Sequence, residues 1–487
     1  MGRGLLALLA VYALLLIPES QPPPPRGAGK EVFRWNRDAF WKELEARLRE
    51  ARSLNEGERR ERFNTALAQV RRAVDLATET NLPPGAAAFD AIEAVFFELA
   101  PIAAVNPERL PEVLSVANRM RQIVKWQSRE WPVNSPAARQ RLYRLLYGSR
   151  AAVEEVLLQM PSVTNSLELM LCEQQSLQQP PAVEVLGVKL HSGDILVSRG
   201  GAPTSALIAR GNDYPGNFSH IALVHVDAES QRVSVIESHI ESGVGVRPIE
   251  QYLGETKLRI MVLRLRSDLP AMVSDPLLPQ RAAALAVSNA LARHIPYDFA
   301  MDHTDPSKQF CSEVATAAYE PFGVKLWLYL SQLSTPGVTS WLGALGVRNF
   351  ESQEPSDLEY DPQVEVVAEW RDPATLFRDH VDNAVTDVML EGAEQGEKLD
   401  YNVWMLPFAR LAKAWSVLLN SFGKVGPVPE GMSAATALRV GRFNLRHTML
   451  QVQVLAGAEK FRTEHGYAPP YWELVSLARE AHAASVR

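Results

Sequence analysis

Cysteine is scarce in this chain of 487 residues, which contains only Cys172 and Cys311. Two cysteines cannot build a disulfide framework, so they form one bridge at most or stay as free thiols. The histidines lack the spacings typical of zinc ligands, and the Gly-x-Ser-x-Gly elbow of serine hydrolases does not occur. We therefore predict neither a metal site nor a cofactor.

Positive charge is also in short supply. The chain has 50 lysines and arginines against 57 aspartates and glutamates, which gives a net charge of −7. Such a balance provides no general attraction for nucleic acid or for anionic lipid, so we expect no DNA or RNA partner. Hydrophobic residues make up 46% of the chain and charged residues 22%, as in ordinary globular proteins.

The N-terminus carries an apolar run from Leu5 to Ile17, preceded by one basic residue. This run has the length of a secretory h-region and is shorter than the roughly twenty residues that span a bilayer. We predict that residues 1–20 form a signal peptide or a retained membrane anchor, and that the protein is exported to the periplasm or cell envelope. The proline-rich stretch 21–30 is typical of an extended linker.

The remaining chain divides into three regions by pattern. Residues 31–177 place apolar side chains three and four positions apart, which predicts a helical domain. Residues 183–348 begin with short strand-like runs, and residues 364–487 return to helical patterns. The predicted fold class is therefore α+β, with helical regions on either side of a central domain.

The central region is expected to form a small antiparallel sheet packed on helices. Its strands are predicted at 193–198, 220–226, 232–238, 244–246 and 258–265. An alanine-rich helix follows at 280–294, and an irregular segment leads to Cys311. A second helical run starts at that cysteine.

Cys311 is the strongest candidate for a nucleophile. A sulfur at a helix N-terminus lies near unpaired N–H groups and the positive end of the helix dipole, which would stabilise a thiolate. His220 opens a strand and is a candidate base, and Glu237 in the next strand would orient it. The alternatives are a small buried residue for Cys311, a sheet histidine for His220 and a solvent-facing carboxylate for Glu237.

Several short motifs around these residues resemble one known group of enzymes. The motifs are Gly193-Asp-Ile-Leu196, Phe218-Ser-His-Ile-Ala-Leu223, Ile236-Glu-Ser238, Pro296-Tyr-Asp298 and Phe310-Cys-Ser-Glu313. Together they resemble the YiiX/YebB-like branch of the NlpC superfamily, which are permuted papain-like cysteine hydrolases. Phe310 departs from the pattern, because many relatives place tyrosine before the cysteine.

The resemblance implies attack of Cys311 on an amide or ester carbonyl, with a covalent acyl-enzyme. It implies a cell-wall peptide or a lipid-like acyl compound as substrate. Two alternatives stay open: acyl transfer, as in the related lecithin:retinol acyltransferases, and a non-catalytic module that binds envelope ligands.

Other residues are candidates for substrate binding. These are Asp194, Ser219, Tyr297 and Asp298. For Asp194 a turn-capping role is the favoured interpretation, and Tyr297 and Asp298 would equally be parts of a plain turn. Four tryptophans of the C-terminal half would either roof an apolar groove or belong to a helical core: Trp327, Trp341, Trp404 and Trp415.

Overall fold

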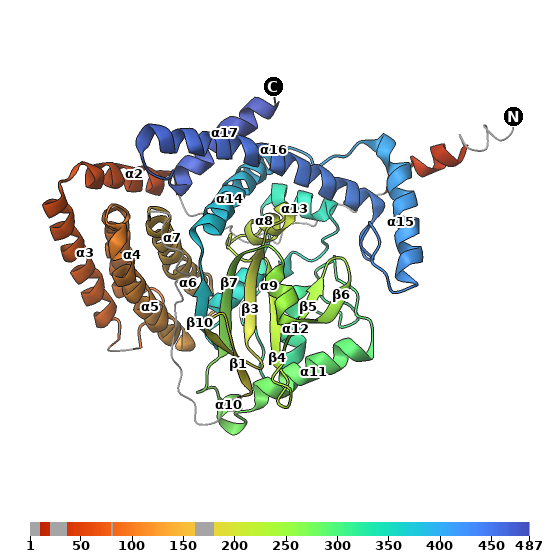
Figure 1. The fold of residues 1–487 in the computed structure, drawn as a ribbon, viewed down its shortest axis with the longest axis horizontal. Helices are drawn as coiled ribbons and strands as arrows, with labels where there is room; N and C mark the ends of the chain where they lie inside the picture. The colour runs from red at the N-terminus through yellow and green to blue at the C-terminus, as the bar shows by residue number, and fades with distance from the viewer. Residues whose placement is uncertain (1–9, 20–36, 79–80, 161–179, 487) are drawn as a thin grey trace.

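The computed structural model describes residues 10–19, 37–78, 81–160 and 180–486. The predicted linker at 21–30 and Cys172 lie outside the described residues. In Figure 1 a twisted sheet occupies the centre, with the N-terminal helices on one side and the C-terminal helices above it. The fold class is α+β, as the sequence predicts.

The central sheet has six antiparallel strands in the order β10-β7-β3-β4-β5-β6. Their bounds are β3 Ile195–Gly200, β4 His220–Val226, β5 Val233–His239, β6 Gly243–Pro248, β7 Lys257–Leu265 and β10 Val364–Trp370. Two further small sheets pair β1 Ala182–Val185 with β2 Val188–His191 and β8 Ser331–Gln332 with β9 Glu351–Ser352.

Each face of the central sheet buries its own apolar cluster, because side chains alternate along a strand. One face, with Ile221 and Leu223, packs against α11 Leu278–Ala292 and α12 Cys311–Tyr319. The other face, with Ala222 and Val224, packs against β2 and the short helix α9 Ile249–Gly254. The sheet is therefore covered on both sides.

Strand β10 extends the central domain beyond its predicted end at residue 348. It pairs with β7 from Val364 opposite Leu265 to Trp370 opposite Ile260. The sequence analysis assigned residues 364–370 to the C-terminal helical region, and that boundary is wrong. The partner strand lies about a hundred residues earlier in the chain, so no local pattern reveals the pairing.

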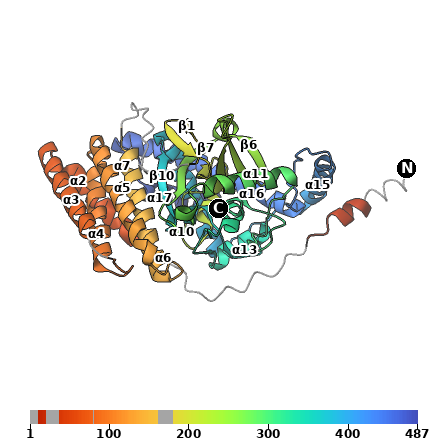
Figure 2. The ribbon, with the colours of Figure 1, turned by 90° about the horizontal axis from the view of Figure 1, so that it is seen from below.

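The N-terminal helices form a separate apolar core around Phe63, Phe89 and Leu146. Their bounds are α2 Arg37–Ser53, α3 Glu56–Leu76, α4 Ala87–Ala104, α5 Leu110–Gln127, α6 Pro136–Leu142 and α7 Gly148–Leu158. Asn55 caps α3, because its side chain accepts the backbone N–H of Glu58 and the Glu58 carboxylate accepts that of Asn55. Figure 2 shows these helices side by side at one end of the molecule.

Most of the remaining helices pack above the sheet and at the opposite end, whereas the short α10 Pro270–Ser274 lies below the sheet in Figure 1. The others are α8 Pro203–Arg210, α13 Pro336–Ala344, α14 Pro373–Glu394, α15 Leu406–Asn420, α16 Ala434–His465 and α17 Tyr471–Val486. Helices α13, α14, α16 and α17 share one apolar core. Among the described residues, no helix combines the length and the apolarity that crossing a bilayer requires.

Buried ion pairs join the N-terminal helices to the sheet. Arg259 on β7 contacts Glu154 of α7 and Asp379 of α14, and all three side chains are almost fully buried. Arg150 of α7 similarly contacts Glu359 and Glu369. Because each buried charge needs its partner, these contacts fix how the helical domain sits on the sheet.

Candidate active site

Helix α12 begins at Cys311, at the position that the sequence predicts. The turn before it is held by Glu313, whose carboxyl accepts the backbone N–H of Phe310 at 2.7 Å. The thiol of Cys311 points to strand β4, where the carbonyl oxygen of Ser219 lies 3.9 Å from Sγ. The Ile221 N–H also interacts with the sulfur. These two backbone groups flank His220, so the sulfur lies beside β4 at the level of His220.

The sulfur is largely shielded from solvent, since Cys311 is only 5% exposed. Burial raises the pKa of the Cys311 thiol to about 12, and nearby N–H groups offset only part of that rise. The cysteine is free, and its thiol carries a proton at neutral pH. The sequence analysis expected a thiolate stabilised by the helix N-terminus, and that expectation is wrong because desolvation outweighs the helix effect.

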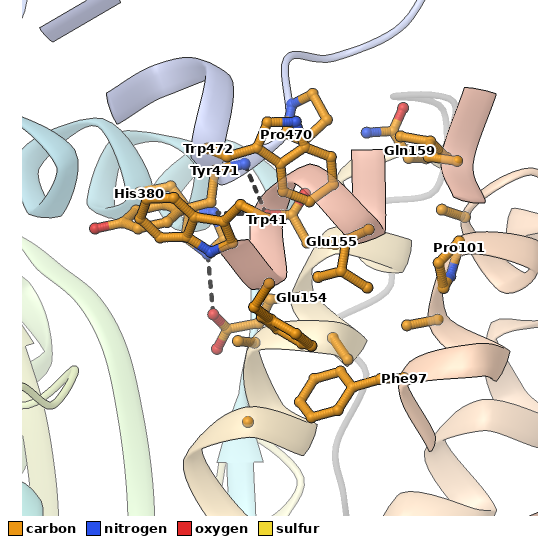
Figure 3. Close-up of a pocket in the computed structure, with 18 of the residues that line it drawn as sticks. Trp41, Phe97, Pro101, Glu154, Glu155, Gln159, His380, Pro470, Tyr471 and Trp472 are labelled. Atoms are coloured by element: carbon orange, nitrogen blue, oxygen red, sulfur yellow. Dashed lines mark hydrogen bonds and ion pairs between the residues drawn. The ribbon is translucent and has the colours of Figure 1, made fainter. Parts of the chain in front are cut away.

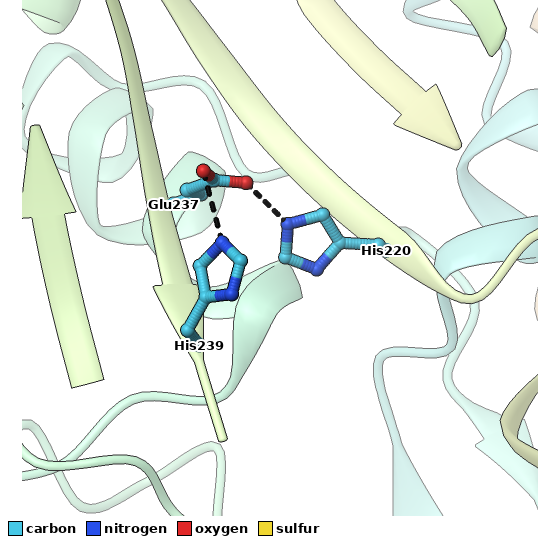
Figure 4. Close-up of side chains that lie close together, drawn as sticks. All are labelled: His220, Glu237 and His239. Atoms are coloured by element: carbon cyan, nitrogen blue, oxygen red, sulfur yellow. Dashed lines mark hydrogen bonds and ion pairs between the residues drawn. The ribbon is translucent and has the colours of Figure 1, made fainter. Parts of the chain in front are cut away.

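His220 and Glu237 form a hydrogen bond between the two strands of the β4–β5 hairpin (Figure 4). The Nε2 atom of His220 lies 2.7 Å from Oε2 of Glu237. On its other side Glu237 contacts His239, with 2.9 Å between His239 Nε2 and Oε1. Ala222 of β4 pairs with Glu237 of β5, so that His220, Glu237 and His239 lie on one face of the sheet.

The protonation states of this cluster follow from its contacts. Burial opposes ionisation of Glu237, but the contacts with His220 and His239 hold its pKa well below the ordinary value. Burial lowers the pKa of His220, and Glu237 compensates only partly, so the imidazole is neutral at pH 7. Because the carboxylate only accepts, the proton of His220 sits on Nε2 and the lone pair on Nδ1.

The sulfur and the imidazole do not form a hydrogen bond with each other in the described part of the chain. The thiol proton instead has the Ser219 carbonyl as its acceptor. Strands β4 and β5 hold the histidine and the carboxylate, and α12 delivers the cysteine next to the same strand end. The structure thus joins His220 and Glu237 by a hydrogen bond and places the Cys311 sulfur against the backbone on either side of His220. Helix α12 packs on the sheet face of Ile221, whereas the register places the His220 side chain on the face of Ala222.

Asp194 does not belong to this neighbourhood. Its carboxylate receives two hydrogen bonds of 2.7 Å from Arg264 and one from the backbone N–H of His191. Ile195 pairs with Leu223, whereas Ser198 pairs with His220, so Asp194 lies at the far end of β4 from the histidine. The geometry favours the turn-capping alternative and gives no support to substrate binding.

The other candidate binding residues differ in position. The Asp298 carboxylate accepts the backbone N–H groups of Ala300 and Asp302, as expected for the plain turn. Burial raises the pKa of Tyr297, and the charge of a Cys311 thiolate would raise it further. Ser219 is buried, and its hydroxyl has no hydrogen-bond partner within the described residues.

Glu354 is a neighbour of the sulfur that the sequence analysis missed. This carboxyl is 3% exposed, and its Oε2 lacks a partner among the residues described. Burial raises the pKa of Glu354 to about 8, and its charge in turn raises the pKa values of Cys311 and Tyr297. It lies in an irregular segment more than forty residues after Cys311, where no motif marks it. By contrast, His239 follows Glu237 by two positions, a spacing that places both on one strand face.

The cluster of Figure 4 also has the composition of a metal site. One ligand atom from each of His220, Glu237 and His239 lies within 4.8 Å of the others. The contact of 2.7 Å between His220 and Glu237 is a hydrogen bond. His239 Nε2 lies 2.9 Å from Oε1, at the distance of an ion pair but without hydrogen-bond geometry. We interpret the cluster as one carboxylate held between two imidazoles.

An apolar cavity of about 110 Å³ lies elsewhere, among α2, α4, α7, α14 and α17. Aromatic side chains including Trp41, Phe97 and Trp472 line it (Figure 3), and one wall carries a contact of 2.9 Å between His380 Nε2 and Glu154. Cys311 and His220 are not among its lining residues. This cavity is therefore distinct from the neighbourhood of the sulfur.

Comparison with protein families gives one match. Residues 189–368 match the model of a family described as permuted papain-like amidase enzymes, YaeF/YiiX. The matched segment begins in β2 and ends within β10, so it includes β3 to β7, most of β10 and α12. Searches among curated proteins and among solved structures gave no match.

Proposed function

Since residues 189–368 form a domain of the permuted papain-like amidase family YaeF/YiiX, we propose that this protein is a cysteine hydrolase in which Cys311 is the nucleophile. His220 acts as general base and then as general acid, and Glu237 positions it. The observation that supports this assignment best is the convergence of α12 with the β4–β5 hairpin. The sulfur contacts the backbone next to His220, and Glu237 is hydrogen-bonded to that histidine, and both contacts support the proposal.

The reaction begins from a neutral thiol and a neutral imidazole. The Cys311 thiol passes its proton to Nδ1 of His220 as the sulfur attacks the substrate carbonyl, and Glu237 stabilises the resulting imidazolium. A thiol with a raised pKa needs this base, because very little thiolate exists at neutral pH. The sulfur must turn from the Ser219 carbonyl toward the imidazole for this step.

The tetrahedral intermediate carries a negative oxygen that needs hydrogen-bond donors. The backbone N–H of Cys311 belongs to the first turn of α12, where N–H groups have no partner within the helix. Collapse of the intermediate transfers the proton from His220 to the leaving amine or alcohol and leaves an acyl group on the sulfur. Water, activated by the same imidazole, then releases the acid and restores the thiol.

The proposals for the substrate and the location of the enzyme come from the sequence. The resemblance favours an amide or ester in a cell-wall peptide or a lipid-like acyl compound. The apolar run at Leu5–Ile17 favours export to the periplasm or cell envelope. Fusion of the N-terminal segment to a reporter that is active only after export would test the location.

Covalent trapping tests the assignment of the nucleophile. We expect an activated ester such as p-nitrophenyl acetate to release a burst of one equivalent of nitrophenol and to acetylate Cys311, as seen by peptide mass. Cys311→Ser removes the burst, and His220→Gln slows it at least about a hundredfold. His225→Gln is the matched control, because His225 lies on the same strand away from the sulfur. A burst that survives in Cys311→Ser would refute the proposal.

A further inference from the structure

Helix α15 presents an apolar stripe to the outside of the molecule. The stripe runs at intervals of three and four residues through the helix and its flanks: Trp404, Phe408, Leu411, Trp415, Leu418 and Phe422. These side chains are between 47% and 73% exposed. Apolar helix faces with this spacing normally pack onto the core of a protein. On α15 this face is exposed to solvent instead.

The opposite side of α15 attaches it to the rest of the chain. Leu406 and Ala409 pack in a small cluster with the start of α16. Ser416 accepts the backbone N–H of Val428 from the loop that follows. These contacts hold one side of the helix in place. The outward stripe therefore belongs to an ordered helix and not to a frayed chain end. Figure 1 shows α15 at the edge of the molecule, away from the N-terminal helices.

A second exposed apolar element adjoins α15. Residues 10–15 form a helical segment, and Val11, Leu14 and Ile17 are more than half exposed. Arg410 of α15 donates to the carbonyl oxygens of Leu15 and Ile17, at 2.9 and 2.8 Å. The exposed stripe of α15 and the exposed N-terminal segment therefore lie next to each other.

The charges near the stripe indicate which kind of surface would bind to it. Between residues 401 and 429 the chain carries Arg410, Lys413 and Lys424 and no acidic residue, although its net charge is −7. Trp404 begins the stripe and Trp415 lies within it, and tryptophan rings favour the boundary between headgroups and acyl chains. An apolar helix face bordered by cations is the pattern of helices that lie in the plane of an anionic membrane.

We propose that α15 and the adjoining N-terminal segment form a docking surface for an anionic lipid bilayer. The apolar stripe enters the boundary between headgroups and acyl chains. The local positive charge of Arg410, Lys413 and Lys424 attracts the lipid phosphates, although Arg410 and Lys413 donate their hydrogen bonds to backbone carbonyls. The attraction is local, so it is compatible with a chain that is acidic as a whole. This inference does not depend on the catalytic assignment.

Docking would also set the position of the candidate active site. The loop after α15 contacts the segment that leads to Cys311: Glu430 pairs with His294 at 2.7 Å. Gly431 fits against Phe299 so closely that a Cβ atom there would lie 2.6 Å from the ring. A bilayer bound to α15 would therefore lie close to the loop that contacts the segment leading to Cys311.

Vesicle flotation with the full chain tests the docking surface. We expect the protein to float with phosphatidylcholine vesicles that contain about one quarter phosphatidylglycerol, and to float less with phosphatidylcholine alone. Leu411→Gln combined with Leu418→Gln should reduce binding to the vesicles about tenfold or more. The reason is that two apolar side chains that would be buried in the bilayer are lost. Both positions are exposed, so the variant should keep the wild-type melting temperature.

The matched control combines Leu76→Gln on α3 with Val273→Gln on α10. These side chains are similarly exposed, at 61% and 68%, but lie far from α15. The control should float like the wild type. Wild-type protein that stays unbound, or a Leu411/Leu418 variant that binds as well as wild type, would overturn the proposal. Light scattering without lipid gives the other decisive outcome: a dimer that this variant converts to monomer would assign the stripe to a second copy of the chain.

Discussion

The carboxylate of Glu237 lies 2.7 Å from Nε2 of His220, and this contact decides which ring nitrogen can accept a proton. The carboxylate stays ionised and so keeps the imidazole proton on Nε2, which leaves Nδ1 as the base. A second imidazole, that of His239, holds the other carboxylate oxygen at 2.9 Å. The orientation of the proposed base thus depends on Glu237, a fully buried carboxylate.

The Glu237→Gln variant should show whether Glu237 positions His220 or contributes to substrate binding. An amide can donate to Nε2 and so favours the wrong tautomer, and we expect kcat to fall by roughly 10²- to 10⁴-fold with little change in KM. Steady-state kinetics with an activated ester measures both constants. Glu241→Gln is the control, because Glu241 is 59% exposed and lies near His239 without contacting His220. Equal losses in both variants would contradict the role given to Glu237.

The pH profile should reveal a neutral thiol and a neutral imidazole. Burial lowers the pKa of His220 below 6.5, so the base becomes protonated and kcat/KM falls only as the pH drops below about 6.5. Burial raises the pKa of Cys311 to about 12, so alkylation by iodoacetamide should still accelerate above pH 10. An ordinary thiol levels off above a pKa of about 8.5. A plateau in the alkylation rate near pH 9 would show that the thiolate is stabilised after all.

Glu354→Gln should change how stability depends on pH. Burial raises the pKa of Glu354 to about 8 from 4.5 in the unfolded chain, so the folded protein holds a proton that the unfolded chain releases. The stability linked to this proton is fully present below about pH 4.5 and is lost as pH rises through about 8. Each unit of pKa difference corresponds to about 1.4 kcal/mol.

The amide of the Glu354→Gln variant cannot ionise, so its free energy of unfolding should decline less than that of the wild type between about pH 5 and pH 9. Urea unfolding at several pH values measures the difference. Parallel curves for both proteins would mean that Glu354 ionises normally in the folded state.

Arg259→Met tests the buried ion pairs between the helical domain and the sheet. The substitution leaves Glu154 and Asp379 buried without their cation, and we expect a loss of about 3 to 5 kcal/mol in the free energy of unfolding. Arg479→Met is the matched control, because its pair with Glu391 is about 40% exposed on both sides and surface pairs contribute about 1 kcal/mol at most. Chemical denaturation measures the free energy of unfolding of both variants. Similar losses in the two variants would show that the buried ion pairs contribute no more to stability than the exposed pair.

Removal of metal should leave the reaction unchanged. We interpret His220, Glu237 and His239 as one carboxylate held between two imidazoles, so dialysis against a chelator should alter neither the burst nor the turnover. Added zinc should inhibit, since it would compete with the proton for His220. Activity that disappears on chelation and returns with zinc would require the cluster to be a metal centre.

Local sequence patterns predicted several elements of the fold. The alternating residues of 220–226 and 232–238 predict the β4–β5 hairpin, and the apolar run after Cys311 predicts the start of α12. The tryptophans show the limit of such patterns. Trp327 and Trp341 are buried in cores, whereas Trp404 and Trp415 are exposed at 63% and 54%. Periodicity gives the spacing of a helix face, and only packing decides whether the face meets protein or another surface.

The sequence by itself determined the α+β class, the hairpin that carries His220 and Glu237, and the helix that starts at Cys311, because each depends on neighbouring residues. Tertiary structure decided the rest. It added β10 to the sheet through pairing across about a hundred residues, and it separated Asp194 from the histidine through strand register. It also brought Glu354 to the sulfur and kept the thiol protonated, since the pKa of a buried group depends on what surrounds it in space.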